Sequence, residues 1–282
     1  MFNAETIAKK YSDLKTLPHV AIRVNQMVHS GNVTMQDFEE VIRLDPVLVS
    51  RLLKLVNSPY FGLVNRVDSI AKAVVFIGMK NLRNLVAVEA LRDVFKEGDP
   101  AEGFSRKNLW MHSATVAILA EMIATRIFGI SGEDCFLAGI IHDIGLVAED
   151  QVAGEQLRAA CRLFNAQERS IVEFERESIG TDHCRVGSIL ARQWNLPEDI
   201  QKAIRFHHDR SRDVVPESPI GILQMAEYFA GKVNYAVVTN QVEPLAPSLV
   251  KHLKMKLDNY KVIIRDLPSE ISKAKELYIS DG

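Results

Sequence analysis

The sequence predicts an all-α protein made of many helices. Three observations predict this fold class: apolar residues recur at intervals of three and four, helix-capping residues precede those runs, and no stretch alternates as a half-buried strand does. With 282 residues, the chain suits one large or two modest domains. We expect two helical halves in contact with each other.

The first predicted helices carry clear start and stop signals. After Leu17, one helix face is formed by Val20, Val24, Met27 and Val28. Gly31-Asn32 stops this helix, and Thr34 with Asp37 resembles a capping box for the next. Asp45-Pro46 supplies an N-cap followed by proline at the first helical position of a third helix.

In the rest of the first half, the sequence predicts a loop and two more helical segments. Proline in Asn57-Ser58-Pro59 ends the third helix. Ser69 opens a further segment, which Gly78 is placed to end before another helix. Residues 97–103, EGDPAEG, are the strongest punctuation, so we place a domain boundary there and predict a helical half at residues 1–97.

Residues 104–235 form the second predicted unit. A long helix carries His112 on its apolar stripe and ends near Gly132. Ser131 and Asp134 are predicted caps of the next helix, which carries His142-Asp143.

Further helices complete this unit. Asp182 or Thr181 precedes the helix that begins with His183, and Pro197 and Pro219 start two more. Residues 236–282 form a predicted C-terminal helical extension.

Composition argues against several function classes. Lys and Arg total 34 against 36 Asp and Glu, so no general positive field favours nucleic acid or an anionic membrane. Cys135, Cys161 and Cys184 lack CxxC spacing and indicate reduced thiols and a cytoplasmic location. The N-terminus has no signal-peptide core, and no stretch approaches 18 apolar residues, so we expect no membrane partner.

Five histidines share apolar helical surroundings within 97 residues: His112, His142, His183, His207 and His208. Helical bundles build metal sites from inward histidines and carboxylates, a donor set suited to iron, manganese or zinc. The adjacent Asp143 stands in the apolar run CFLAGIIHDIGLVAED, where its burial needs compensation by a cation, a proton or hydrogen bonds. Because a lone histidine is more often a hydrogen-bonded core residue, only the whole set favours a metal.

This set resembles the HD-domain superfamily of metal-dependent phosphohydrolases. HDIG at residues 142–145 is its signature form, and a histidine before the paired His207-His208 is most similar to the HD-GYP branch. The resemblance implies that the five histidines, Asp143 as the anchor, and Glu227 bind one or two divalent ions.

The first half resembles the narrower HDOD family, the HD-related output domains. The resemblance is carried by Leu17-Pro18, Asp45-Pro46, LLKLVNSPYFG at 52–62 and SIAKAVVFIGMKNLRNL at 69–85. With the HD-like half it covers about residues 12–235. It implies a multi-helical HD-domain-like bundle packed on an N-terminal helical HDOD bundle, acting as a bacterial signal-transduction output module.

Three departures from catalytic HD-GYP patterns weaken the prediction of hydrolysis. Leu146 stands in place of the lysine in HDIGK, the GYP segment after His208 is absent, and Glu227 replaces an aspartate. Without that lysine, phosphate charge would fall to the metal and to a nearby arginine such as Arg205. His207 and His208 point about 100° apart on an ideal helix, so both reach one centre only if the helix frays or two metals are present.

Two functions therefore stay open. The first is a regulatory module that binds a signalling protein or a small phosphorylated ligand. The second is an active metal-dependent phosphohydrolase acting on a phosphoester, such as a nucleotide or a cyclic dinucleotide. Nucleic-acid binding has only two basic hints, residues 80–84 and 210–212, which are typical of solvated faces.

Overall fold

The computed structural model describes residues 1–14, 19–30, 34–96, 104–164, 169–211, 213–238 and 242–274. Within these ranges the chain is helical and has no β-strand, which confirms the predicted all-α class. The helices are α1 (Ala4–Leu14), α2 (His19–Ser30), α3 (Met35–Arg43), α4 (Pro46–Val56), α5 (Ile70–Lys96), α6 (Arg106–Arg126), α7 (Glu133–Ile141), α8 (Ile144–Leu163), α9 (Ile171–Ser178), α10 (His183–Gln193), α11 (Glu198–Phe206), α12 (Pro219–Lys232), α13 (Pro247–Met255) and α14 (Leu257–Lys273).

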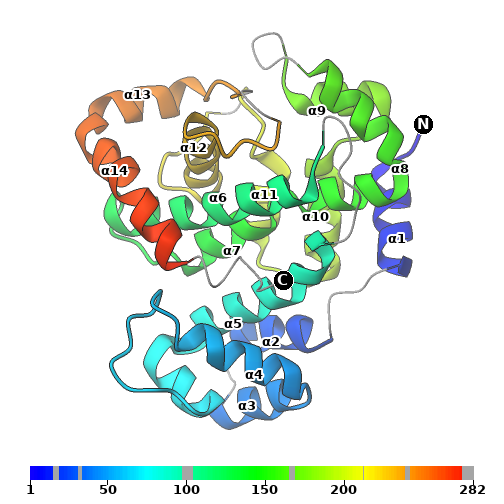
Figure 1. Ribbon diagram of the computed structural model, residues 1–282. Helices are drawn as coiled ribbons and strands as arrows, with labels where there is room; N and C mark the ends of the chain where they lie inside the picture. Colours follow the sequence, from blue (N-terminus) through cyan, green and yellow to red (C-terminus); the bar gives the residue numbers. More distant parts are fainter. Residues whose placement is uncertain are drawn as a thin grey trace.

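Helices α2 to α5 form one bundle, which occupies the lower part of Figure 1. Its local signals are confirmed. Thr34 and Asp37 make the reciprocal capping box of α3, and the Asp45 carboxylate accepts hydrogen bonds from the first turn of α4. At Gly78, φ is +80°, so α5 is interrupted at the predicted position. Only glycine adopts this backbone conformation without strain.

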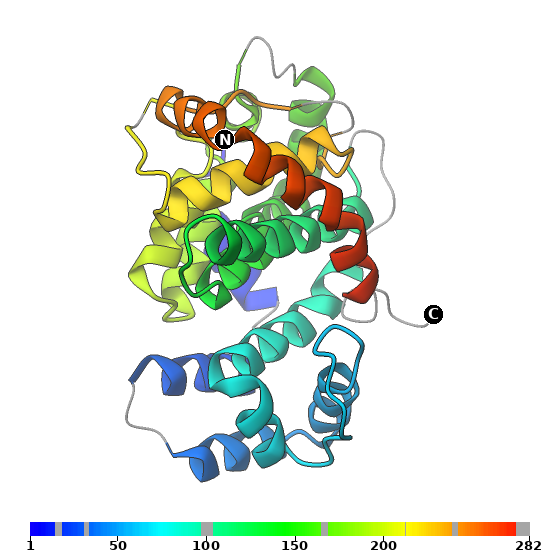
Figure 2. The same ribbon diagram turned by 90° about the vertical axis from the view of Figure 1, so that its left-hand side faces the viewer.

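The second bundle is built around α6, whose residues are buried along almost its whole length. Helices α7, α12 and α14 pack against α6, and Figure 2 shows α14 lying across it. The predicted C-terminal extension thus forms two helices, α13 and α14, that cover this bundle. None of the described helices combines the length and apolar character that crossing a membrane requires.

Helix α1 precedes the first bundle in the chain but packs on α8 and α10 of the second. The Phe2 amide donates a hydrogen bond to the Ile179 carbonyl at 2.7 Å, which ties the N-terminus there. The predicted boundary at residues 97–103 lies outside the described ranges. The division into units at 1–97, 104–235 and 236–282 stays a prediction.

Helix α7 joins the two bundles, and the cap predicted at its start is wrong. Ser131 and Asp134 do not cap α7; its N-cap is Gly132, without a side-chain hydrogen bond. The Asp134 carboxylate instead binds Lys80 at 3.1 Å and Arg83 at 2.8 Å, both on α5. The stronger attraction of two cations draws this carboxylate away from the helix terminus.

Candidate metal centre

The sequence suggested that the HDIG segment lies inside one helix. It lies instead at a break between two helices. His142 is the C-cap of α7, and Asp143 is the N-cap of α8. The carbonyls of a last helical turn lack partners within the helix. The His142 ring uses one of them, because its Nδ1 lies 2.7 Å from the Gly139 carbonyl oxygen.

Two glycines allow the helices around this break to approach closely. A Cβ at Gly139 would lie 2.5 Å from Cα of Ala117 on α6. A Cβ at Gly145 would lie 2.0 Å from the His183 carbonyl oxygen at the start of α10. Any larger residue would push α6 or α10 away. The glycine of HDIG therefore lets His183 approach Asp143.

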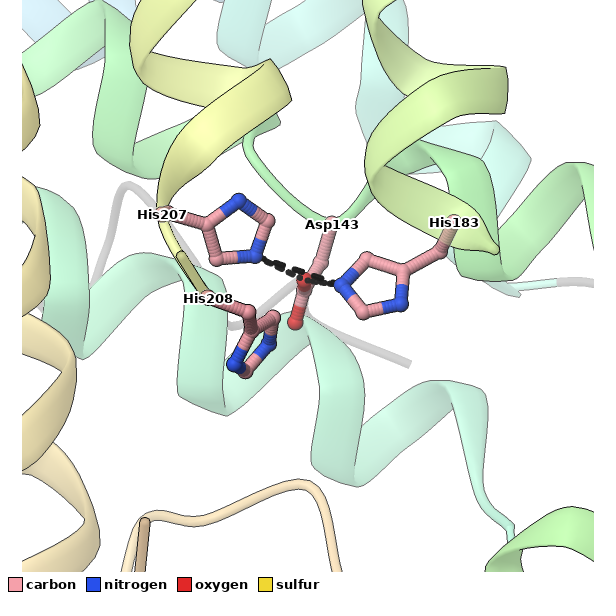
Figure 3. A group of neighbouring side chains, drawn as sticks. All are labelled: Asp143, His183, His207 and His208. Atoms are coloured by element: carbon pink, nitrogen blue, oxygen red, sulfur yellow. Dashed lines mark hydrogen bonds and ion pairs between the residues drawn. The ribbon is translucent and has the colours of Figure 1, made fainter. Parts of the chain in front are cut away.

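Asp143 stands at the centre of the histidine cluster and is almost fully buried. Its Oδ2 atom lies 3.2 Å from Nε2 of His142 and 3.6 Å from Nε2 of His112. Its Oδ1 atom lies 3.4 Å from Nε2 of both His183 and His207, as the dashed lines in Figure 3 show. Each carboxylate oxygen thus faces a different pair of imidazoles.

The seven residues predicted as ligands converge as two groups. Within each group, one donor atom per residue lies within 4.8 Å of every other. The groups are Asp143, His183, His207 and His208, and His112, His142 and Glu227. Helix α11 ends at Phe206, so His207 and His208 lie in a turn and both reach the cluster. Because the helix has ended before this pair, helix geometry does not hold the two rings apart.

Every histidine of the cluster has its Nδ1 atom against an acceptor. Backbone carbonyls of Tyr235, Gly139 and Ile204 face Nδ1 of His112, His142 and His207, while carboxylates of Glu175 and Glu243 face Nδ1 of His183 and His208. Since these partners only accept, Nδ1 carries a proton, and in the neutral form of each ring the lone pair is on Nε2. All five rings therefore present the same donor atom to the centre.

These Nε2 atoms face one another at close range. The His112–His142 and His183–His207 pairs each have an Nε2–Nε2 distance of 3.2 Å. Between two neutral rings, neither Nε2 has a hydrogen to share. Burial acts to lower the pKa of His183, but Cys184 and Glu175 outweigh it and raise that pKa, so a proton shared between His183 and His207 is the alternative to a cation. Asp143 Oδ1 is also buried without a hydrogen-bond partner. Imidazole and carboxylate donors left in this way fit a divalent cation of the iron, manganese and zinc class.

The charges of the cluster depend on burial and on its carboxylates. Burial lowers the pKa of His112, because the charged ring is poorly solvated there. Burial also acts to lower the pKa of His208, but Glu243 and Glu227 outweigh it and raise that pKa to about 10. Burial would raise the pKa of Asp143, yet the surrounding histidines hold it well below the usual range.

Two carboxylates behind the ligands were not predicted from the sequence. Both Glu175 oxygens contact the His183 ring, at 2.9 and 2.8 Å, and one also accepts the His183 amide at 2.9 Å. Glu243 contacts His208 at 3.1 Å and Arg210 at 2.6 Å. A usable signal existed for Glu175, which follows Ile171 by four residues and so falls on an apolar helix face.

Arg205, the predicted phosphate contact, points elsewhere. Its guanidinium lies 4.0 Å from Asp182 and lines a surface depression on the outer side of His208, where Arg176 and Arg210 also lie. It is absent from the cavity beside the donors, which Leu146 lines instead. Arg210 lies at the edge of both hollows.

The comparisons with known proteins agree with this architecture. The HDOD domain profile matches residues 14–210. An uncharacterised protein of Treponema pallidum (strain Nichols) is 31% identical over 214 residues, which are 73% of this chain and 40% of that protein. The chain thus spans less than half of this relative's length.

Two crystal structures share the fold. A candidate phosphohydrolase of Shewanella amazonensis SB2B is 25% identical, with a TM-score of 0.69 and 96% of each chain covered. A candidate signal transduction protein of Marinobacter aquaeolei VT8 is 20% identical, with a TM-score of 0.75, and the match covers 97% of this chain and 64% of that one. On the profile match over most of its length, the chain belongs to the HDOD family.

Proposed function

We propose that this chain is a signal-transduction module that holds two divalent metal ions and binds a small phosphorylated ligand at them. One observation carries the proposal: the two oxygens of buried Asp143 face two separate sets of Nε2 donors. A carboxylate placed in this way is suited to bridge two ions. The flanking ligands are then His112, His142 and Glu227 on one side, and His183, His207 and His208 on the other.

Bound divalent ions would supply Lewis-acid charge that attracts and polarises a phosphoryl oxygen. The chain itself orients the donors. Carbonyls and carboxylates at Nδ1 hold each ring in one tautomer, and such outer partners commonly change metal affinity 10- to 100-fold. Glu227 lies 3.6 Å from His208 and 4.0 Å from His207, so its longer side chain still reaches the cluster.

Binding without efficient turnover is favoured by the charge around the cluster. Leu146 is 4% exposed and lines the cavity where a lysine would supply a cation. Arg210, the arginine at the cavity edge, is paired with Glu243. Developing negative charge on a leaving oxygen would therefore find little help from side chains.

A metal-dependent phosphohydrolase is the second candidate. The position of Asp143 between two sets of donors favours it, since two ions held there would act on both the attacking and the leaving oxygen. The 25% identical Shewanella amazonensis protein is described as a candidate phosphohydrolase.

The two candidates separate in one assay. We expect protein loaded with manganese or iron to bind inorganic phosphate, measured by calorimetry, and to hydrolyse cyclic dinucleotides little or not at all. Brisk turnover that requires metal and disappears in Asp143→Ala would establish the phosphohydrolase instead. Absence of both metal and phosphate binding would refute both candidates.

A further inference from the structure

The cavity beside the donors has two chemically different parts. It encloses about 790 Å³, a figure that includes its open mouth. Asp143 and the histidines form one end. Most of the remaining wall is apolar: Leu146, Phe164 and Ile171 come from the α8–α9 side, and Val238 and Leu245 come from the segments that follow α12. Its polar members are Arg210, Gln224, Tyr228 and Glu243.

The charge of this cavity suits one phosphoryl group. Arg210 is the only lysine or arginine among the described residues that line it, and Glu243 already balances its charge. Two divalent ions would bring four positive charges against three carboxylates, those of Asp143 and Glu227 and that of Glu175 behind His183. The small positive surplus suits one phosphoryl group and not several. A second phosphate would lie against apolar walls, where an uncompensated charge is costly.

We infer that the ligand of this cavity is a phosphomonoester with one phosphoryl group and a compact apolar or aromatic body. The inference rests on the proposed function, because metal ions at the cluster would hold the phosphoryl group. The apolar walls select the rest of the ligand. Polyphosphates and dinucleotides present further charges that these walls do not compensate.

Two phosphonates provide a direct test, because neither has an ester bond to hydrolyse. Phenylphosphonate and methylphosphonate share the anionic group and differ in the apolar body. In calorimetric titrations of the full chain loaded with manganese, we expect phenylphosphonate to bind about tenfold more tightly or better, since its ring leaves water for the apolar walls. Equal affinities would overturn the inference.

Substitutions locate the effect. Leu146→Lys adds a cation beside Asp143, so it should tighten methylphosphonate binding and shrink the preference for the phenyl group. Leu245→Asp changes a partly exposed residue of the wall and should also bring the ratio of the two affinities towards one. The matched control is Leu257→Lys on α14, which is 53% exposed and should leave both affinities unchanged. A preference unaffected by both cavity variants would place the ring elsewhere and refute the inference.

The outcomes for the two proposals differ. Metal-loaded protein that binds both phosphonates equally would refute the apolar-bodied ligand and leave the metal centre standing. Protein that retains no metal yet prefers phenylphosphonate would refute the metal centre and leave the apolar selectivity standing.

Discussion

The α2–α5 bundle and the histidine cluster hold polar side chains in different ways. In the bundle, several polar side chains meet complementary partners, while the unsatisfied buried atoms, Asn25 Oδ1 and Ser58 Oγ, lie on different elements. The Asn57 amide donates to the carbonyls of Leu53 and Val67 and accepts the Val67 amide, each at 2.7 Å. Buried Glu89 pairs with Arg92 at 3.0 Å. These contacts satisfy polar groups of a loop and of a helix face, so no ligand from outside the chain is needed there.

Around Asp143, groups of the same kind face one another. Nε2 atoms meet at 3.2 Å, and Asp143 Oδ1 has no hydrogen-bond donor. An arrangement that is incomplete by itself costs free energy unless a cation or a proton completes it. The difference teaches that satisfied polar contacts mark structural positions in this chain, while convergent unsatisfied donors mark the proposed binding site.

The largest expected effect comes from removing the central carboxylate. Asp143→Ala should weaken metal binding by about 100-fold or more, because both sets of donors lose their shared oxygen ligand. Metal analysis after dialysis against a weak chelator measures this. Asp68→Ala, which removes an exposed carboxylate paired with Lys72, is the control and should retain wild-type metal. Unchanged metal content in Asp143→Ala would exclude Asp143 as the anchor.

A smaller effect is expected behind the ligands. Glu175→Gln keeps the shape of the side chain but removes the charge that holds the His183 ring, so metal affinity should fall about 10- to 100-fold. Competition with a chelating dye gives the affinity. Glu177→Gln, on the same helix with a more exposed side chain paired with Arg169, should have no effect. Equal affinities in the two variants would show that Glu175 does not position His183.

A substitution in the first bundle should change the stability of the protein and leave its metal affinity unchanged. Asn57→Ala removes three hydrogen bonds, two of them to buried Val67, and should lower the free energy of unfolding by about 2 kcal/mol. Urea unfolding measures this change. Asn65→Ala, exposed in the same loop, serves as the comparison. Loss of metal in Asn57→Ala would contradict the separation of structural and binding positions.

The smallest effect concerns the contact between the bundles. Burial would raise the pKa of Asp134, but Arg83 and Lys80 outweigh it and lower that pKa. The ionised carboxylate therefore stabilises the fold at pH values above the ordinary pKa of an aspartate. This contribution is lost as pH falls below about 4. Asp134→Asn should therefore cost about 0.5–1 kcal/mol at pH 7, a modest figure because the aspartate is partly exposed, and progressively less as the pH falls through the lowered pKa of Asp134. A difference of the same size at pH 7 and pH 3 would refute the ion-pair origin.

Much of the fold could be predicted because local signals agree with tertiary packing. The caps at Thr34, Asp45 and Asp182 formed as expected, since no partner draws these side chains away from the helix start. Asp182 binds Arg176 through Oδ2 and keeps Oδ1 for the Arg185 amide of its helix. Asp134 failed as a cap because its partners come from α5, more than fifty residues earlier. Sequence spacing carries no information about such a competitor.

The sequence predicted which residues converge in the cluster but not the carboxylates that contact them from behind. The five histidines and Asp143 stood out as polar residues in apolar runs that together formed a known pattern. Glu243 did not, because it follows no helical period and reaches His208 only through the fold. Arg205 was chosen for its place on the same helix as His207, but the turn after Phe206 directs the histidines towards Asp143 and leaves Arg205 beside Asp182.

The most direct test of the account is the number of metal ions that the wild-type chain holds. Purified without chelator, supplied with manganese or iron at neutral pH and freed of excess metal, the protein should retain two ions per chain by plasma mass spectrometry. Two ions would agree with a bridging Asp143 flanked by two donor sets. A chain that retains no metal under these conditions would contradict the central claim and leave the cluster as a packed, protonated remnant.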